Sequence, residues 1–225
     1  MSEFRAMNTQ RIITIDGPAG VGKSTLAKRV AGALGIAYLD TGAMFRTVAL
    51  RAGEDGFILP EHQVEALLHH LAFSLSGSGN DTALACNGTP VGAEIRTESV
   101  GMLASRYATM PVVRAWLKTA QQELGRLYSL VAEGRDMGSV VFPDAPYKFF
   151  LDAAPQIRAA RRVEQLAALG VVEDVDVVTE QIRARDTLDR GRAIAPLRAA
   201  KDAVVIDTSH LDIDGVFAAI MRHIV

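Results

Sequence analysis

The segment that most restricts the fold of this chain is Gly17-Pro18-Ala19-Gly20-Val21-Gly22-Lys23-Ser24, which has the spacing Gly-x-x-x-x-Gly-Lys-Ser. β-branched residues from Arg11 to Asp16 precede it and predict a buried strand, and helical periodicity follows it. A strand, a glycine-rich turn and a helix in this order form a P-loop, whose backbone amides and helix N-terminus bind phosphates. The alternative is a glycine-rich turn that matches by chance, and the flanking strand and helix make it the weaker interpretation.

This motif predicts a site for a nucleoside triphosphate. Lys23 is expected to reach the β- and γ-phosphates, and the Ser24 hydroxyl is expected to ligate Mg²⁺. The expected ATP-binding residues are Gly17, Pro18, Ala19, Gly20, Val21, Gly22, Lys23, Ser24 and Thr25. An Asn-Lys-x-Asp element is absent from the sequence, which argues against a GTPase switch. Leu75-Ser76-Gly77-Ser78-Gly79 has a faint similarity to the signature of transporter ATPases, but it stands between two expected hairpin strands and is interpreted as a turn.

Composition narrows the class of protein. A chain of 225 residues, 49% of them hydrophobic, buries a sizeable core and fits one main domain. The formal charge of −2 argues against broad nucleic-acid binding, and the single cysteine, Cys86, cannot form an intramolecular disulfide. No apolar run approaches the roughly 20 residues that span a bilayer. We therefore expect a cytoplasmic protein with no membrane partner.

Strands are expected to alternate with helices along most of the chain, which predicts an α/β fold with a mainly parallel central sheet flanked by helices. The expected strands after the first are Ile36–Leu39, Ser129–Ala132, Tyr147–Leu151 and Val204–Asp207. The expected helices are Ser24–Leu34, Ala43–Arg51, a long amphipathic helix around Val113–Leu127, Pro155–Leu169, Val175–Arg190 and one that closes the chain.

The middle of the chain breaks this alternation. Phe73–Ser76 and Thr82–Cys86 are apolar strand candidates, and Asn87-Gly88 is a strong hairpin signal. We expect a small antiparallel sub-domain at about residues 73–97, inserted in a single P-loop domain that runs from 11 to 225. Residues 1–10 are expected to form a flexible N-terminal extension.

Four polar clusters fall where loops would meet around a second ligand. They are Asp40–Arg46, Ser105 with Arg114, Gly134–Gly138, and Arg185 with Asp189 and Arg192. Two of them follow expected strands, so they should lie at the same sheet edge as the P-loop, where open α/β sheets bind ligands.

Taken together, these segments resemble bacterial cytidylate kinase, also called CMP kinase, of the P-loop nucleoside monophosphate kinases. The resemblance runs from about Ile12 to the C-terminus. Its most specific pieces are Gly134-Arg135-Asp136-Met137-Gly138-Ser139-Val140-Val141-Phe142-Pro143-Asp144-Ala145, Arg190-Gly191-Arg192-Ala193-Ile194-Ala195-Pro196-Leu197 and Gly92-Ala93-Glu94-Ile95-Arg96. Thr41 stands where the family often has serine, and Phe45 where tyrosine is common.

The resemblance implies phosphoryl transfer from ATP, with Mg²⁺, to CMP or dCMP, in a monomeric enzyme with an inserted NMP-binding sub-domain and a helical lid at about 155–192. It also implies which residues bind the acceptor. Those matching Ser105, Arg114 and Asp136 face cytosine, those matching Arg185 and Asp189 lie by the ribose, and those matching Thr41, Arg46, Arg135 and Arg192 approach the acceptor phosphate. Lys23, Arg135 and Arg192 would stabilise the transferred group.

The residues themselves allow plainer alternatives. Arg185 and Asp189 could form an exposed i, i+4 ion pair, although a helix would place both on one face with Arg192 at i+7. Arg135 could merely neutralise Asp136. Thr41 could cap the helix that follows it, and Ser105 could satisfy a backbone group.

A lid arginine is expected on the helix that starts near Pro155. Arg158, Arg161 and Arg162 share one face of it, and Arg161 is the preferred candidate for closing over the donor phosphates. The alternative is a solvated basic face. Two rival functions also remain: a P-loop kinase for another small acceptor such as UMP or shikimate, and a nucleotide-binding regulator without turnover.

Overall fold

A computed structural model describes residues 10–168 and 170–224 of the chain. The expected N-terminal extension, apart from Gln10, lies outside the described residues. So does Leu169, where the sequence places the end of a helix.

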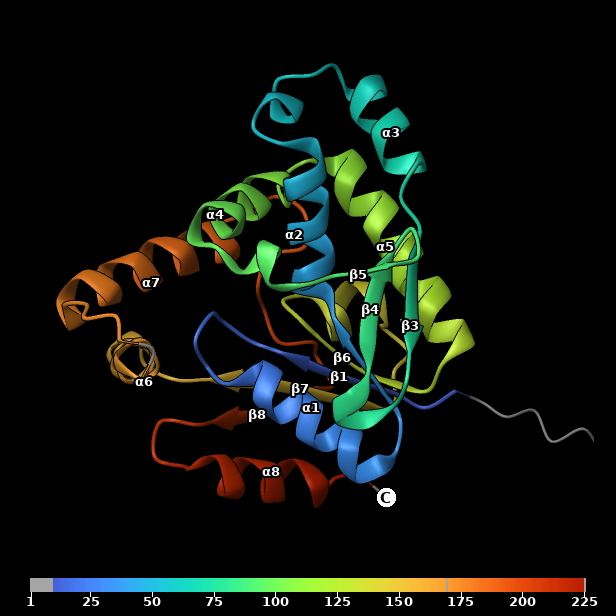
Figure 1. The fold of residues 1–225 in the computed structure, drawn as a ribbon. Coiled ribbons are helices and arrows are strands. Elements are labelled where there is room, and N and C mark those ends of the chain that lie inside the picture. Colours follow the sequence, from blue (N-terminus) through green and yellow to red (C-terminus); the bar gives the residue numbers. More distant parts are fainter. Residues whose placement is uncertain (1–9, 169, 225) are drawn as a thin grey trace, which may run out of the picture.

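A five-stranded parallel sheet forms the centre of the molecule, as predicted (Figure 1). Its order is β2-β6-β1-β7-β8, so the strand before the P-loop lies in the middle. The strands are β1 (Ile12–Asp16), β2 (Ala37–Asp40), β6 (Leu130–Gly134), β7 (Tyr147–Asp152) and β8 (Val204–Asp207). The register aligns Asp16 with Gly134 and Asp40 with Glu133, so these strands end at one edge.

Helices cover both faces of this sheet. On one face α1 (Lys23–Leu34) packs beside α8 (Ile213–Met221), and on the other α2 (Thr41–Ala52) and α5 (Pro111–Leu127) pack against the strands (Figure 1). Both faces are therefore buried, as sheets with crossover helices require. The observed helix boundaries lie within about two residues of the predicted ones.

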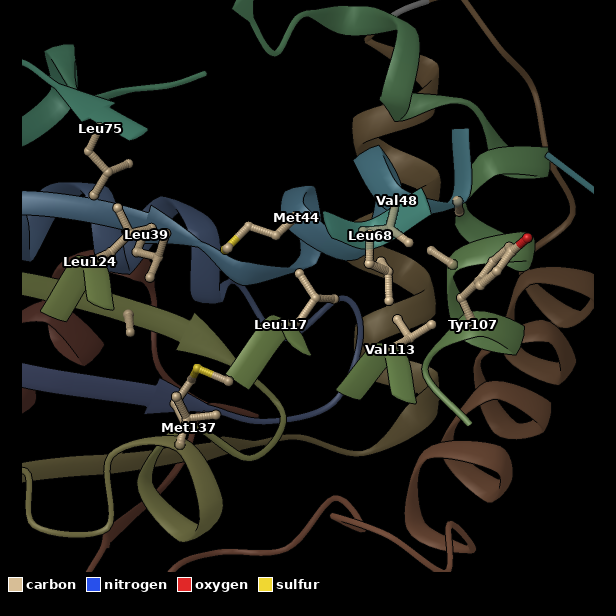
Figure 2. Packing of buried hydrophobic residues seen from close by; sticks show 14 of the residues in the cluster. Leu39, Met44, Val48, Leu68, Leu75, Tyr107, Val113, Leu117, Leu124 and Met137 are labelled. Carbon is tan, nitrogen blue, oxygen red and sulfur yellow. The ribbon is translucent and has the colours of Figure 1, made fainter. Parts of the chain in front are cut away.

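The strand residues alternate between two cores. Ile13 and Ile15 of β1 and Val131 of β6 pack toward α1 and α8. Leu130 and Ala132 of β6 pack toward the opposite side, in a larger cluster that contains Met44, Leu117 and Met137 (Figure 2). Met137 is 1% exposed, so the segment that follows β6 is held partly by a side chain in this core.

The inserted segment forms the expected antiparallel strands. They are β3 (Phe73–Ser76), β4 (Ala83–Cys86) and the short β5 (Thr89–Pro90), and Asn87 and Gly88 turn between the last two with φ of 51° and 76°. The turn between β3 and β4 lies against the main domain. There Gly79 N donates to Ile36 O at 2.8 Å and Tyr38 N donates to Thr82 Oγ1 at 3.1 Å.

The structure also contains two helices that the sequence patterns do not predict, α3 (Glu61–His69) and α4 (Glu98–Tyr107). α6 (Pro155–Ala167) and α7 (Val175–Arg190) pack on each other through a small apolar cluster of Ala159, Val178 and Ile182. In Figure 1 this pair lies to one side of the sheet. In the described part of the chain, no helix combines the length and apolar character needed to cross a membrane.

Candidate active site

The P-loop connects β1 to α1 as predicted. Gly17, Gly20 and Gly22 have φ of 149°, 78° and 94°, which side chains with a Cβ rarely adopt. At Gly17 a Cβ would also lie 2.2 Å from the carbonyl oxygen of Leu151 in β7. Glycine is therefore required there both for the backbone conformation and for close packing on the neighbouring strand.

Lys23, the first residue of α1, lies under this loop. Its side chain is buried, and Nζ donates to Pro18 O at 2.6 Å. Burial and the nearby Arg135 lower the pKa of Lys23 to about 7. An anion placed in the loop would favour the charged form of the lysine, so the site is electrostatically suited to phosphates. Ser24 and Thr25 stand exposed on the first turn of the helix.

The Gly134–Gly138 segment follows β6 at the same sheet edge. Asp136 forms a buried ion pair with Arg114 of α5, so Arg135 does not merely neutralise its neighbour in the chain. Arg114 also donates to Ala108 O at 3.2 Å. Burial raises the pKa of Asp136, and the charge of Arg114 opposes that shift. After Asp136 the chain makes a π-helical turn, Met137–Val141, a feature found often at functional sites.

Asp189 joins two arginines from different parts of the chain. Arg135 Nε donates to its Oδ2 at 2.8 Å, and Arg192 donates to its Oδ1. Burial would raise the pKa of Asp189, but the two arginines outweigh it and the pKa is lowered. The carboxylate is 2% exposed, so the expected alternative of an exposed ion pair with Arg185 is wrong.

The predicted single helical face for Arg185, Asp189 and Arg192 is wrong for its last member. α7 ends at Arg190, because Gly191 has low helix propensity and the chain then turns toward Pro196. Arg192 nevertheless returns to Asp189 through its side chain. Burial and the charge of Arg135 lower the pKa of Arg185 to about 10, which marks a site crowded with positive charge.

Two further predicted acceptor residues lie on α2. Thr41 Oγ1 donates to Glu133 O at 2.6 Å, while Asp40 Oδ1 accepts from Ala43 N and caps the helix. The alternative that Thr41 is the cap is therefore wrong. Arg46 Nη1 donates to Ile95 O at 2.9 Å and to Thr97 O at 3.0 Å, and burial lowers the pKa of this arginine.

Ser105 lies on α4, half-buried. Its Oγ donates to Gly101 O at 3.2 Å, so in this conformation the hydroxyl satisfies a backbone carbonyl of its own helix. The oxygen keeps its lone pairs for an incoming donor. Both interpretations of this serine therefore remain compatible.

The arginine next to the P-loop is Arg158 rather than the expected Arg161. Arg158 is 1% exposed and donates to Ala19 O at 2.9 Å, and it forms an ion pair with Asp186 of α7. Arg161 points instead to the end of β8, where it donates to Thr208 O at 2.6 Å. The two arginines are three residues apart on the same helical face, but their side chains point to different partners. The helical spacing alone does not predict which of them reaches the P-loop.

Two acidic residues at this edge are not among the predicted ones. Asp16 accepts from Met137 N at 2.9 Å and from Gly138 N at 2.8 Å. Glu133 is buried, with Tyr38 donating to its carboxylate. Burial and the charge of Asp40 raise the pKa of Glu133, and Lys23 opposes the shift. The sequence signal available was their position: each acid stands at or next to the last residue of a strand that feeds a glycine-rich loop.

This chain is similar in sequence to proteins named cytidylate kinase. The family model described as "Cytidylate kinase" matches residues 13–225. A cytidylate kinase of Nitratidesulfovibrio vulgaris strain Hildenborough is 60% identical over 214 residues, covering 95% of this chain and 92% of that protein. One from Oleidesulfovibrio alaskensis is 60% identical over 93% of this chain and 96% of its own length. A cytidylate kinase of Lawsonia intracellularis is 46% identical, with 97% of both chains covered. On the family match and these relatives, the chain belongs to the cytidylate kinase family.

Proposed function

We propose that this protein transfers the terminal phosphoryl group of ATP to CMP or dCMP, giving ADP and CDP or dCDP, in pyrimidine nucleotide metabolism. The observation that carries the proposal is the junction of two loops at one sheet edge. The P-loop follows β1, and the Gly134–Gly138 segment follows the adjacent β6, in register with it. A donor and an acceptor bound at these loops would meet between them.

The acceptor's base would be bound by Asp136, Arg114 and Ser105. Cytosine carries an exocyclic amino donor beside its N3 and O2 acceptors, and a carboxylate paired with an arginine and a hydroxyl is complementary to that edge. Because Arg114 and Asp136 are both buried, a base with the wrong pattern would leave polar groups unpaired. Specificity for cytosine would follow from this penalty more than from attraction.

The acceptor's sugar and phosphate would be bound by the arginine cluster around Asp189. The Nε atoms of Arg185 and Arg192 are buried and have no hydrogen-bond partner in the described structure. Unpaired buried donors are unfavourable, and a phosphate or sugar oxygen would pair them. Thr41, Arg46 and Arg135 would complete the phosphate contacts, with Asp189 next to the ribose.

The donor would be bound by the P-loop from Gly17 to Thr25, with Lys23 reaching the β- and γ-phosphates. Mg²⁺ would supply positive charge that neutralises the triphosphate, and it would act as a Lewis acid. Ser24 offers a hydroxyl for the ion, and the carboxylate of Glu133 lies near enough to Ser24 for the hydroxyl to influence its pKa. Both are oxygen ligands of the kind that Mg²⁺ prefers, so the residues present fit this ion.

Catalysis would then rest on position and charge. Lys23, Arg135 and Arg192 would stabilise the charge on the transferred group, because phosphoryl transfer needs little covalent help from protein. Asp136 is paired with Arg114 and would read the base and orient the loop. A general base is not needed, because a phosphate acceptor is already ionised at neutral pH. Arg158, and Arg161 after a movement of α6, are the arginines that could approach the donor phosphates.

The inserted sub-domain at about 73–97 and the lid at about 155–192 would close when both substrates bind. Closure would exclude water, which otherwise accepts the phosphoryl group and wastes ATP. Hydrogen exchange in these two segments should slow when ATP and CMP are both present. Unchanged exchange in both segments would contradict the closure.

The test of the function is ADP release by purified protein with ATP and Mg²⁺. CMP, dCMP, UMP, AMP and shikimate are supplied in parallel. Turnover with CMP and dCMP alone supports the proposal, and turnover with another acceptor would leave the P-loop site intact and reassign the acceptor site. ATP binding without ADP release with any acceptor would favour a regulator instead. We further propose a monomer acting in the cytoplasm, to be checked by light scattering and cell fractionation.

A further inference from the structure

Asp16 occupies the boundary between the two halves of the proposed active site. It is the last residue of β1, directly before Gly17 of the P-loop, and its side chain is 4% exposed. Its two carboxylate oxygens reach to the neighbouring loop, where Oδ1 accepts from Met137 N and Oδ2 accepts from Gly138 N. One side chain therefore joins the start of the donor loop to the segment that carries Arg135 and Asp136.

The two amides that Asp16 binds belong to the first residues of the π-helical turn Met137–Val141. Amides at the start of a helical turn have no partner within it, and they favour a negative charge. An ionised carboxylate supplies two acceptors at once, which an asparagine cannot do, because its amide group would face one N–H with another. The chemistry of this contact is thus specific to aspartate.

The segment that Asp16 holds is also fixed from its other sides. Thr41 Oγ1 donates to Glu133 O just before it, and Met137 packs into the core shown in Figure 2. A Cβ on Gly138 would lie 2.8 Å from Thr14 Oγ1, so the backbone there sits close against β1. A shift at Met137 and Gly138 would therefore be passed to the two residues before them and not absorbed by free space.

We propose that Asp16 is a positioning residue for the acceptor: by binding the Met137 and Gly138 amides, it fixes the direction in which Arg135 and Asp136 face CMP. Asp16 touches neither nucleotide. It acts through the loop, and its influence falls on the acceptor side although it is adjacent in sequence to the donor loop. The proposal rests on the proposed CMP kinase function.

Burial raises the pKa of Asp16 to about 7, while its bonds to Gly138 and Met137 oppose that shift. The amides that Asp16 positions therefore limit the rise of its pKa and favour its ionised form. If Asp16 only stabilised the fold, its replacement would weaken CMP and ATP binding alike. A positioning role predicts weaker binding of CMP alone, so the two roles can be told apart.

The experiment measures CMP and ATP binding separately, by isothermal titration of each nucleotide, in the wild type and in Asp16→Asn. Loss of one buried hydrogen bond should weaken CMP binding about 5- to 100-fold. ATP binding should change less than about threefold. A matched control is Asp212→Asn, because Asp212 also accepts from a helix-terminal amide, Gly215 N at 2.7 Å, but at α8, away from the site. It should change neither affinity.

Equal weakening of both nucleotides, or unchanged CMP binding in a folded variant, would overturn the proposal. If Asp16→Asn does not fold by circular dichroism, Asp16→Glu keeps the charge and moves it by one methylene. The same selective loss for CMP is then expected, and unchanged CMP binding again overturns the inference. Wild-type protein that releases no ADP with CMP refutes the proposed function itself, so the two failures are distinguishable.

Discussion

Removing one partner of the ion pair between Arg114 and Asp136 should destabilise the protein more than removing both, while either change should abolish function. Both side chains are almost fully buried, at 9% and 5% exposure. Removing one partner from a buried pair leaves an uncompensated charge and typically costs about 3–5 kcal/mol. Arg135 and Arg192 also lower the pKa of Asp136 and so share its charge, which places Arg114→Met near the lower value, about 3 kcal/mol.

Removing both partners should be far less harmful. In Arg114→Met/Asp136→Leu neither charge of the pair remains buried. We therefore expect the free energy of unfolding of the double variant to lie within about 1–2 kcal/mol of the wild-type value. For a chain of this size the single variant should melt about 6–12 °C lower. Both variants should lose CMP turnover, because the pair that we propose binds cytosine is broken in each.

Thermal and urea unfolding followed by circular dichroism measure these differences. Arg183→Met is the matched control, since Arg183 pairs with Glu180 at the surface, where both side chains are about half exposed or more, and such pairs contribute less than about 1 kcal/mol. A loss below about 1 kcal/mol in Arg114→Met would refute the reasoning. So would a double variant that is no more stable than Arg114→Met.

Three other perturbations test the donor side. Because the pKa of Lys23 is lowered to about 7, the native protein binds fewer protons than the unfolded one between that pH and 10.5, and this residue makes stability rise with pH in that window. ATP binding at pH 8 should recharge it, so titrations in Tris and HEPES should report uptake of roughly 0.9 proton, absent in Lys23→Met; no uptake in the wild type would contradict the lowered pKa. Gly17→Ala, whose Cβ would lie 2.2 Å from a β7 carbonyl oxygen, should lower the free energy of unfolding in urea by about 3 kcal/mol. Gly22→Ala, where a Cβ would have no atom within 4 Å, should lower it by about 1–2 kcal/mol. Equal losses would show that the contact with β7 is unimportant. Arg158→Met should weaken ATP binding about tenfold by isothermal titration, because a buried guanidinium that contacts the P-loop is lost. Arg161→Met should weaken it less than threefold. The reverse order would favour Arg161 as the lid arginine, as the sequence predicts.

The sequence predicts the main features of the fold because those features are locally encoded. The strand before Gly17, the Asn87-Gly88 hairpin and the α7 boundaries follow from β-branched runs, turn residues and periodicity, and all are confirmed. α3 is not predicted because only two of its nine residues, Val64 and Leu68, are buried. α4 buries Val100, Gly101, Ala104 and Tyr107, so only two of its four buried residues have large apolar side chains.

The site is predicted less completely because its contacts join distant segments. The glycine-rich loops and the motif arginines are visible in the sequence, but Asp189 and Arg135 are 54 residues apart, and Asp16 and Met137 are 121 apart. Nothing local specifies such pairs. Likewise, a helical face groups Arg158 with Arg161, and only the packing of α6 on α7 and the P-loop separates their partners.

The carboxylate shared by Arg135 and Arg192 has a consequence for electroneutrality. With Arg185 close by, three guanidinium groups surround the Asp189 carboxylate, so these four groups together carry an excess of two positive charges. A phosphate monoester above its second pKa of about 6 brings two negative charges and balances the cluster, whereas its monoanion does not. Affinity for the acceptor should therefore fall in mildly acidic solution, because the phosphate of the ligand takes up a proton there, and protonation of Asp16, whose pKa is about 7, should lower it further.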